Sequence, residues 1–394
     1  MTISEGKLLI EQKVEDFNKN EKQYLSKTFQ ETEARTRFID PFFQALGWDF
    51  DQTNIAKHLW DVHREYSQKD NSNTKKPDYA FNINGKLRFF VEAKAPWVPL
   101  TDKAPVFQAK RYAYSTNGKA PVVIITDFQE FRVFNAVERP VFDNPLQGLI
   151  KDFDFKYFDY ISNWDFIYNN FSKEAVTYGS IDKLRGKITK ETKTLDKEFL
   201  SDLIEFREIL AKNIAIRNKE FEVDIVNECV QRILDRLIFI RNLEDREIEN
   251  EILFRISDNK DNIYKSLLPV FSKLNDDYNG LLFKPDISDK VIVDDDVIKK
   301  LIKNLYPPYS PFQFDIIEPE ILGRIYEKFL GSKIRLTESH QAKVEEKPEV
   351  RHAGGVFYTP QFIVENIVLN TLGKMLTENK MTPEEIAGNK GLQP

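Results

Sequence analysis

Two carboxylates and one amine stand close together in a short, otherwise apolar stretch of this sequence. The segment 77–94, PDYAFNINGKLRFFVEAK, has the alternation of a β-hairpin, with Asp78 at its start and Glu92 and Lys94 near its end. Side chains alternate along a strand, so Glu92 and Lys94 share one face with Phe90. Charged groups on such a face are costly to bury unless they have partners. The pair therefore indicates either a surface salt bridge or a site that does chemistry.

The length of the hairpin turn decides whether Asp78 joins the other two residues. With a two-residue turn at Asn84–Gly85, Asp78 pairs with Val91 and faces away from Glu92. With a three-residue turn closed by Gly85 as a bulge, it pairs with Phe90 and shares the face of Glu92. The sequence allows both arrangements, and a bend at Pro77 would also bring the groups together. We predict that Asp78, Glu92 and Lys94 converge.

Convergence of these groups is suited to the hydrolysis of phosphodiester bonds. Carboxylate oxygens hold Mg²⁺ while leaving waters on it, and such an ion activates water and neutralises phosphate charge. A lysine beside it can orient the attacking water and stabilise the charge that develops on phosphorus. The carbonyl of Ala93 is a further candidate ligand. We therefore predict Mg²⁺ as a cofactor, with Asp78 and Glu92 as its ligands.

The elements around the hairpin predict an α/β domain with a mixed sheet over residues 1–172. Helical periodicity runs through 6–29, 31–46 and 103–116, and strand patterns occur at 53–59, 61–66, 78–83, 86–94, 121–127 and 130–135. Over 174–306 the apolar spacing is helical, which predicts an all-α connector domain that we place at 173–345. The segment 306–314, YPPYSPFQF, reads as a Pro-rich break, and 332–352 as an exposed loop. A third domain is expected to begin at 346.

Composition excludes several classes of protein. With one cysteine and four histidines in 394 residues, neither a disulfide framework nor a zinc cluster is expected. No apolar run reaches the length of a membrane span, and the charged N-terminus is unlike a signal peptide, so we expect a cytoplasmic protein without a membrane partner. A net charge of −6 gives no global attraction to nucleic acid. Any contact with DNA must come from local basic surface.

The order Asp78, Glu92, Lys94 resembles the PD-(D/E)xK motif of nucleases, and two further features extend the resemblance. The helix TEARTRFIDPFFQALGWD is similar to the opening helix of restriction-enzyme nuclease domains, which implies that Glu33 assists the metal site. The segment QAKRY places Gln108 and Tyr112 four residues apart on one helix face. It resembles the QxxxY element of RecB-like nucleases, which implies that these two residues support the catalytic site.

The segment 354–372, GGVFYTPQFIVENIVLNTL, carries a second resemblance. Thr359 can cap a helix that begins at Pro360, and the glycines allow close approach of a ligand. The segment is similar to the opening motif of adenine-specific DNA methyltransferases of the type I and type IIG kind. The resemblance implies the start of a Rossmann-like domain over 346–394. It also implies contacts to S-adenosylmethionine from five residues: Gly355, Phe357, Tyr358, Thr359 and Pro360.

The glycine-rich cofactor loop and the catalytic Asn/Asp-Pro-Pro-Tyr/Phe motif of those methyltransferases do not follow in the sequence given, so we expect a truncated methyltransferase part. The order of domains resembles single-chain type IIG restriction–modification enzymes. The resemblance implies a Mg²⁺-dependent endonuclease that acts on double-stranded DNA, fused to the methyltransferase, with transient dimers for cutting both strands. The alternative is a modification enzyme whose inactive N-terminal domain only holds DNA. A helical adaptor without catalysis would leave both motifs unexplained.

Overall fold

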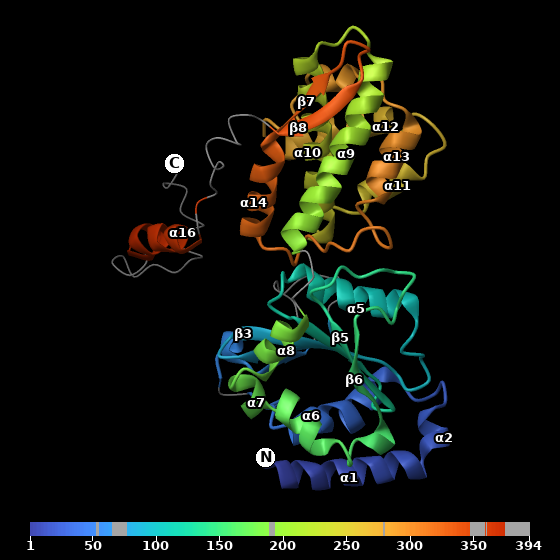
Figure 1. Cartoon of the computed structure of the whole chain (residues 1–394), viewed down its shortest axis with the longest axis vertical. Coiled ribbons are helices and arrows are strands. Elements are labelled where there is room, and N and C mark those ends of the chain that lie inside the picture. Colours follow the sequence, from blue (N-terminus) through green and yellow to red (C-terminus); the bar gives the residue numbers. More distant parts are fainter. Residues whose placement is uncertain are drawn as a thin grey trace.

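The computed structural model describes residues 1–52, 55–64, 77–188, 194–278, 280–346, 359 and 361–374. Two parts follow one another along the longest axis of the molecule (Figure 1). The N-terminal part contains the mixed sheet, and the second part is built mainly of helices. The expected α/β region followed by a helical region is confirmed.

The N-terminal part begins with helices that cover one face of the sheet. These are α1 (Ile3–Lys19), α2 (Glu21–Tyr24), α3 (Glu31–Ala34), the π-helical turn η1 (Arg35–Ile39) and α4 (Asp40–Ala45). The strands are β1 (Val62–Arg64), β2 (Tyr79–Ile83), β3 (Lys86–Ala93), β4 (Val122–Thr126), β5 (Glu130–Asn135) and β6 (Leu149–Lys156), with α5 (Lys103–Ser115) between β3 and β4. The part ends with α6 (Trp164–Phe171), α7 (Lys173–Thr177) and α8 (Ser180–Ile188).

The six strands form one sheet in the order of the sequence. All neighbours are antiparallel except β3 and β4, which α5 connects as a parallel pair. One face packs Phe81, Phe89 and Val91 against the N-terminal helices and α6. The other face packs Phe90 and Val123 against α5. Both faces of β3 are therefore covered, which explains the buried apolar run Phe89, Phe90 and Val91 in its middle.

Three features of the N-terminal part differ from the sequence-based expectations. In the predicted strand 53–59, residues Lys57–Leu59 form a 3₁₀ turn, and 53–54 lie outside the described residues. Strand β6 was not predicted, because its exposed Lys and Asp residues hide the alternation. Val176, Ile181 and Leu184 pack in the same core as the sheet, so α7 and α8 join the N-terminal part beyond the expected boundary at residue 172.

The second part is a bundle with one hairpin. Its helices are α9 (Leu195–Arg217), α10 (Val223–Asp245), α11 (Ile252–Ser257), α12 (Ile263–Tyr278), α13 (Asp295–Lys303) and α14 (Pro319–Leu330). The hairpin consists of β7 (Ser332–Leu336) and β8 (Ala342–Glu346). Ile334 and Ala342 are buried in the core of the bundle. The expectation of an exposed loop from 332 is therefore wrong for 332–346.

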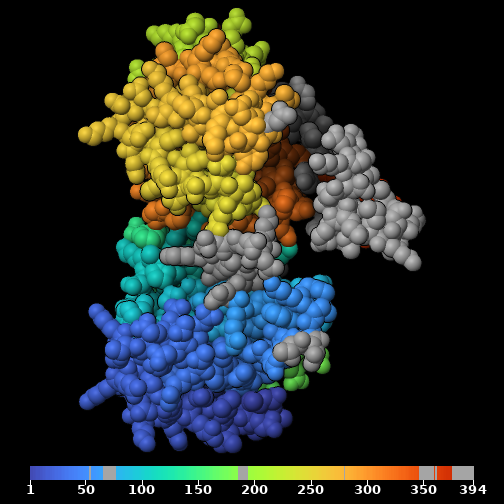
Figure 2. All heavy atoms as spheres, turned by 180° about the vertical axis from the view of Figure 1, so that it is seen from behind, coloured from blue at the N-terminus to red at the C-terminus, as the bar shows by residue number. Residues whose placement is uncertain are grey.

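The Pro-rich segment 306–317 joins the two parts instead of forming a loose break. Phe312 and Phe314 are 2% and 0% exposed. The guanidinium of Arg111 on α5 donates a 2.6 Å hydrogen bond to the carbonyl of Phe312, and the amide of Gln313 donates a 2.9 Å hydrogen bond to the hydroxyl of Ser115. Seen from behind, the region of α5 (teal) lies between the blue N-terminal part and the yellow and orange helices (Figure 2).

Helix α16 (Gln361–Val368) continues into the π-helical turn η5 (Leu369–Gly373) and lies to one side of the rest of the described chain (Figure 1). It confirms the helix expected after Pro360. Its apolar side chains are exposed, with Phe362 at 70% and Leu369 at 67%. None of the helices that the structure describes is both long and apolar enough to cross a membrane.

Candidate active site

The hairpin of β2 and β3 sets the position of the candidate site. Ile83 pairs with Lys86, so Asn84 and Gly85 form a two-residue turn, and both have a positive φ (51° and 72°). This is the backbone that a tight hairpin requires and that Asn-Gly adopts readily. The register then shifts between Phe81 and Asn82, because Arg88 on β3 is an extra residue without a partner on β2.

This shift brings the catalytic candidates to one face. Beyond Arg88, Ala80 pairs with Phe90 and Tyr79 with Val91, so the register continued by one residue sets Asp78 opposite Glu92. Neither turn considered from the sequence describes the hairpin fully. The turn has two residues, as in the arrangement that would set Asp78 away from Glu92. A β-bulge at Arg88, three residues after Gly85, nevertheless puts Asp78 on the same face as Glu92, as the three-residue turn would have done.

Asp78, Glu92 and Lys94 form one connected group at the end of β3. The amide of Ala93 donates a 2.7 Å hydrogen bond to Oδ2 of Asp78. The Nζ of Lys94 lies 2.7 Å from Oε1 of Glu92 and 2.7 Å from the carbonyl oxygen of Ala93. Each of the three charged side chains is 14% exposed. The group is thus sheltered but still reachable from solvent.

The electrostatics of the group favour a bound cation. Burial and the charge of Asp78 raise the pKa of Glu92 to about 7, although Lys94 opposes this shift. Burial disfavours the charged form of Lys94, but Glu92, Asp78 and Glu31 outweigh it and raise the pKa of the lysine. Mutual repulsion between two poorly solvated carboxylates is the arrangement that a divalent cation relieves.

Helix α3 contributes Glu31 to this group, whereas the sequence had pointed to Glu33. Oε2 of Glu31 lies 3.7 Å from Nζ of Lys94. The carboxylate of Glu33 instead accepts a 2.8 Å hydrogen bond from the amide of Gln30 and closes a capping box at the start of α3. The two glutamates are two residues apart on a helix and so point in different directions. The structure therefore places Glu31, and not Glu33, beside Lys94.

Arg35 is a second residue of this helical segment that sequence reasoning missed. Its Nη1 lies 3.3 Å from Oδ1 of Asp78. The spacing of four residues between Glu31 and Arg35 was the available signal, because residues four apart share a helix face.

Gln108 and Tyr112 lie one turn apart on α5, which covers the sheet face of Phe90. Tyr112 is 3% exposed, and its ring meets Phe90 edge-on at 5.7 Å between centroids. Since Phe90 precedes Glu92 on the same face of β3, Tyr112 packs beside the strand that carries the candidate carboxylate. Gln108 is partly buried.

The oxygen atoms present fit Mg²⁺ better than a softer metal. Asp78 and Glu92 supply carboxylates and Ala93 supplies a carbonyl, and hard oxygen ligands with room for water are what Mg²⁺ prefers. Over the described ranges, no three Asp, Glu, His or Cys side chains are grouped closely enough to form a complete metal cage. A site here would thus consist of two carboxylates, a backbone oxygen and waters.

The residues expected to contact S-adenosylmethionine fall largely beyond the described ranges. Gly355, Phe357, Tyr358 and Pro360 lie outside the described residues, and Thr359 is described and exposed. Their arrangement therefore remains a prediction.

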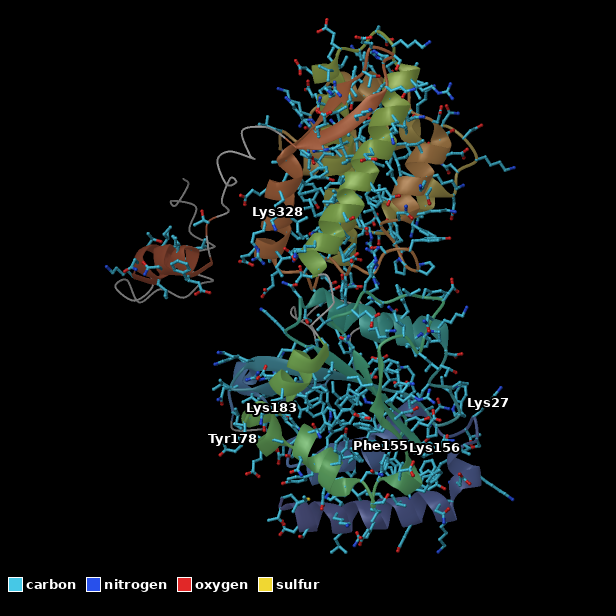
Figure 3. The ribbon with its side chains drawn as sticks, in the orientation of Figure 1. Lys27, Phe155, Lys156, Tyr178, Lys183 and Lys328 are labelled. Carbon is cyan, nitrogen blue, oxygen red and sulfur yellow. The ribbon has the colours of Figure 1, made fainter. Side chains whose placement is uncertain are left out.

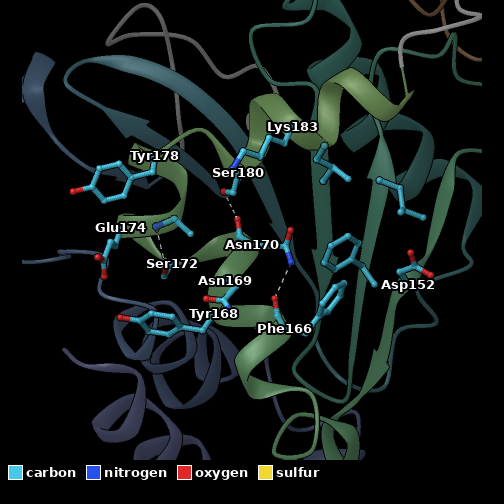
Figure 4. A pocket seen from close by; sticks show the side chains of 14 residues that line it. Asp152, Phe166, Tyr168, Asn169, Asn170, Ser172, Glu174, Tyr178, Ser180 and Lys183 are labelled. Carbon is cyan, nitrogen blue, oxygen red and sulfur yellow. Dashed lines mark hydrogen bonds between the residues drawn. The ribbon is translucent and has the colours of Figure 1, made fainter.

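A separate pocket of about 600 Å³ lies between β6 and helices α6–α8. Tyr178 and Lys183, which line this pocket, lie on the edge of the N-terminal part opposite to Lys27 (Figure 3). Figure 4 shows the hydroxyl of Ser180 donating to the carbonyl of Asn170, a bond of 2.6 Å that holds α8 against α6. Asp78, Glu92 and Lys94 do not line this pocket, so we assign it no part in the candidate chemistry.

Comparison with known proteins links the N-terminal part to restriction enzymes. The family described as Type I restriction enzyme R protein N terminus (HSDR_N) matches residues 50–141, the range that contains β1–β5 and α5. The chain is also 30% identical over 365 residues to the Type II restriction enzyme and methyltransferase RM.Eco57I of Escherichia coli, an alignment that covers 89% of this chain and 35% of that protein. No solved structure matches the chain.

These matches confirm the resemblance to restriction–modification enzymes. The chain is homologous to an enzyme of that class and carries a restriction-enzyme domain of the HSDR_N type in its N-terminal part. It spans about a third of the length of the curated relative that it matches.

Proposed function

We propose that the N-terminal part is the Mg²⁺-dependent DNA endonuclease moiety of a type IIG restriction–modification enzyme, with a PD-(D/E)xK site. The observation that carries this proposal is the meeting of Asp78, Glu92 and Lys94 at the end of β3, where Asp78 accepts a hydrogen bond from the amide between the other two residues. Homology to a restriction enzyme and methyltransferase supports it.

Each residue has a chemical role in this proposal. Asp78 and Glu92 would hold Mg²⁺, with the carbonyl of Ala93 as a further candidate ligand. When bound, the ion would neutralise charge at the phosphate and acidify water. Lys94 orients the attacking water and donates to the developing negative charge on the phosphate oxygens. Gln108 and Tyr112 support the site from α5. Glu31, which lies beside Lys94, assists the metal site in the role that the resemblance implied for Glu33.

We further propose that an adenine-specific methyltransferase domain begins near residue 346. Its Tyr358, Thr359 and Pro360, with Gly355 and Phe357, would lie against S-adenosylmethionine. Double-stranded DNA is the shared substrate of the two moieties, and a transient dimer of nuclease domains would cut both strands. The relative's printed description as a restriction enzyme and methyltransferase supports this division of labour.

Plasmid cleavage by the complete enzyme tests the nuclease proposal. Glu92→Ala and Lys94→Ala are expected to lower the cleavage rate by at least about 100-fold, because the first removes a ligand of the metal ion and the second removes the group that stabilises charge on the phosphate. Glu174→Ala and Lys183→Ala, in the separate pocket, serve as controls and should cleave normally. Cleavage at the wild-type rate by either site variant would refute the assignment.

Methylation by the same preparations separates the two functions. The site variants are expected to methylate adenine as the wild type does. A wild-type enzyme that methylates but does not cut DNA under any metal condition would favour the alternative, in which the N-terminal part only holds DNA.

A further inference from the structure

Both oxygens of the Asp78 carboxylate are held by protein donors. The amide of Ala93 donates to Oδ2 at 2.7 Å, and Nη1 of Arg35 donates to Oδ1 at 3.3 Å. A single hydrogen bond leaves a carboxylate free to turn about its Cβ–Cγ bond. Two donors on opposite oxygens fix the plane of the group as well as its position.

Arg35 is itself held by a second contact of the same guanidinium. Its Nε donates a 3.1 Å hydrogen bond to the hydroxyl of Tyr79, and its carbon Cζ lies 4.9 Å from the centre of the Tyr79 ring. Tyr79 is fully buried, and its side chain points to the face of the sheet that packs on the helices. Arg35 thus joins residue 78 to residue 79, whose side chains leave the strand on opposite sides.

The hydroxyl of Tyr79 continues this chain of hydrogen bonds in one direction. It donates its only proton to Oδ1 of Asp40 at 2.7 Å, so that it is an acceptor toward Arg35. The other oxygen of Asp40 accepts from Arg64 at the end of β1. Asp40 is 6% exposed. The guanidinium of Arg35 is therefore oriented by a buried tyrosine, which is itself oriented by the buried carboxylate of Asp40 and its half-exposed partner Arg64.

We propose that Arg35 is a positioning residue of the metal site, which fixes the Asp78 carboxylate opposite Glu92 through the relay Arg35–Tyr79–Asp40–Arg64. This inference rests on the proposed nuclease function. Residues that orient a metal ligand without touching the metal commonly change metal affinity by about 10- to 100-fold when they are replaced. The two-pronged contact requires the planar guanidinium, because a lysine ammonium cannot reach Asp78 and the Tyr79 hydroxyl in the same geometry.

A competing interpretation gives Arg35 only the role of a counter-charge. Glu31, Asp78 and Glu92 are balanced by Lys94 and Arg35, and each cation also repels an incoming metal ion. If charge alone mattered, Arg35→Lys would bind metal like the wild type, and Arg35→Gln would bind it more tightly. If Arg35 positions Asp78, both variants bind metal more weakly.

The experiment is Mn²⁺ titration calorimetry on the full chain, with thermal unfolding to verify that each variant is folded. We expect a loss of affinity of about 10-fold or more for Arg35→Lys and Arg35→Gln, and a loss in the same direction for Tyr79→Phe, which removes the acceptor of Arg35 but no charge. Arg37→Lys is the matched control. Arg37 lies on the same helical turn but pairs with Asp16 at 3.0 Å, away from the site.

Wild-type affinity in Arg35→Lys, or tighter binding by Arg35→Gln, would overturn the positioning role while leaving the proposed function intact. An absence of Mn²⁺ binding by the wild type itself, with the same heat from Glu92→Gln, would refute the metal site and this inference together. Weaker binding by both Arg35 variants, with Arg37→Lys unchanged, would establish the role.

Discussion

The backbone amide of Ala93 donates a 2.7 Å hydrogen bond to the carboxylate of Asp78. Ala93 lies between Glu92 and Lys94 in the sequence. Its hydrogen bond therefore ties the position of Asp78 directly to the positions of these two residues. A charge-assisted bond from a backbone amide is stronger than a neutral one. The relative positions of Asp78, Glu92 and Lys94 therefore depend on the register of the hairpin. A change in this register would separate the three side chains.

Metal affinity is expected to rise with pH because of Glu92. A metal ligand must be deprotonated to bind, and the pKa of this carboxyl is raised from 4.5 to about 7. Affinity for Mn²⁺ should therefore increase between pH 6 and pH 8, by up to about tenfold per unit below the pKa. Calorimetry at several pH values measures this, and a flat profile would contradict the raised pKa.

The same shift predicts how the stability of the metal-free protein changes with pH. The folded state binds more protons at Glu92 than the unfolded state does between about pH 4.5 and pH 7. The free energy of unfolding should therefore fall as pH rises through this window, because the sheltered carboxyl must ionise. Glu92→Gln removes this contribution. The difference in Tm with and without Mn²⁺ should grow with pH in the wild type and not in this variant.

Glu31 and Glu33 provide a pair of substitutions that separates the site from its scaffold. Glu31→Ala removes the carboxylate beside Lys94 and is expected to weaken Mn²⁺ binding several-fold with little change in Tm. Glu33→Ala breaks the capping box and should cost about 1 kcal/mol of stability while leaving metal affinity unchanged. Mn²⁺ titration and thermal unfolding of both variants measure this, and the opposite pattern would restore the original assignment of Glu33.

The sequence predicts the composition of the site better than its geometry. Residue type and spacing indicate Asp78, Glu92 and Lys94 as candidates, because charged side chains on the face of an apolar strand are costly to bury without partners. The β-bulge at Arg88 could not be located, since an extra residue in a strand leaves no local pattern when both faces are apolar. The choice between Glu31 and Glu33 likewise depended on where α3 begins. A shift of two residues in a helix start changes which side chain faces the site.

The junction between the two parts was also beyond sequence reasoning. The segment 306–317 has the prolines of a linker, and proline content alone favours an exposed loop. Its phenylalanines are nevertheless buried against α5 and the bundle. Burial of this kind depends on partners more than a hundred residues away in the sequence, such as Arg111, and no local pattern reports them.

The hairpin turn offers a direct test of how tightly its backbone is constrained. Gly85 has φ +72°, and an added Cβ would lie 2.8 Å from the carbonyl oxygen of His58. Gly85→Ala should therefore cost both strain and a backbone clash, more than about 2 kcal/mol together. Gly47 has φ +83° with no neighbour within 4 Å, so Gly47→Ala should cost only the strain, about 1 kcal/mol. Urea unfolding measures both values, and equal losses would show that the hairpin tip tolerates the clash.

The contact between α5 and the segment 306–317 predicts that the two parts unfold together. Phe312→Ala should cost about 3–5 kcal/mol, because its fully packed ring touches both Tyr114 of α5 and Phe199 of α9. Arg111→Met leaves the buried carbonyl of Phe312 without its donor and should cost about 1–3 kcal/mol. Lys119→Ala removes an exposed ion pair with Glu318 across the same junction and should cost less than about 1 kcal/mol.

Calorimetry should show one transition for the wild type and two for Phe312→Ala. A single transition shifted equally in all three variants would mean that the junction is not the contact that couples the two parts.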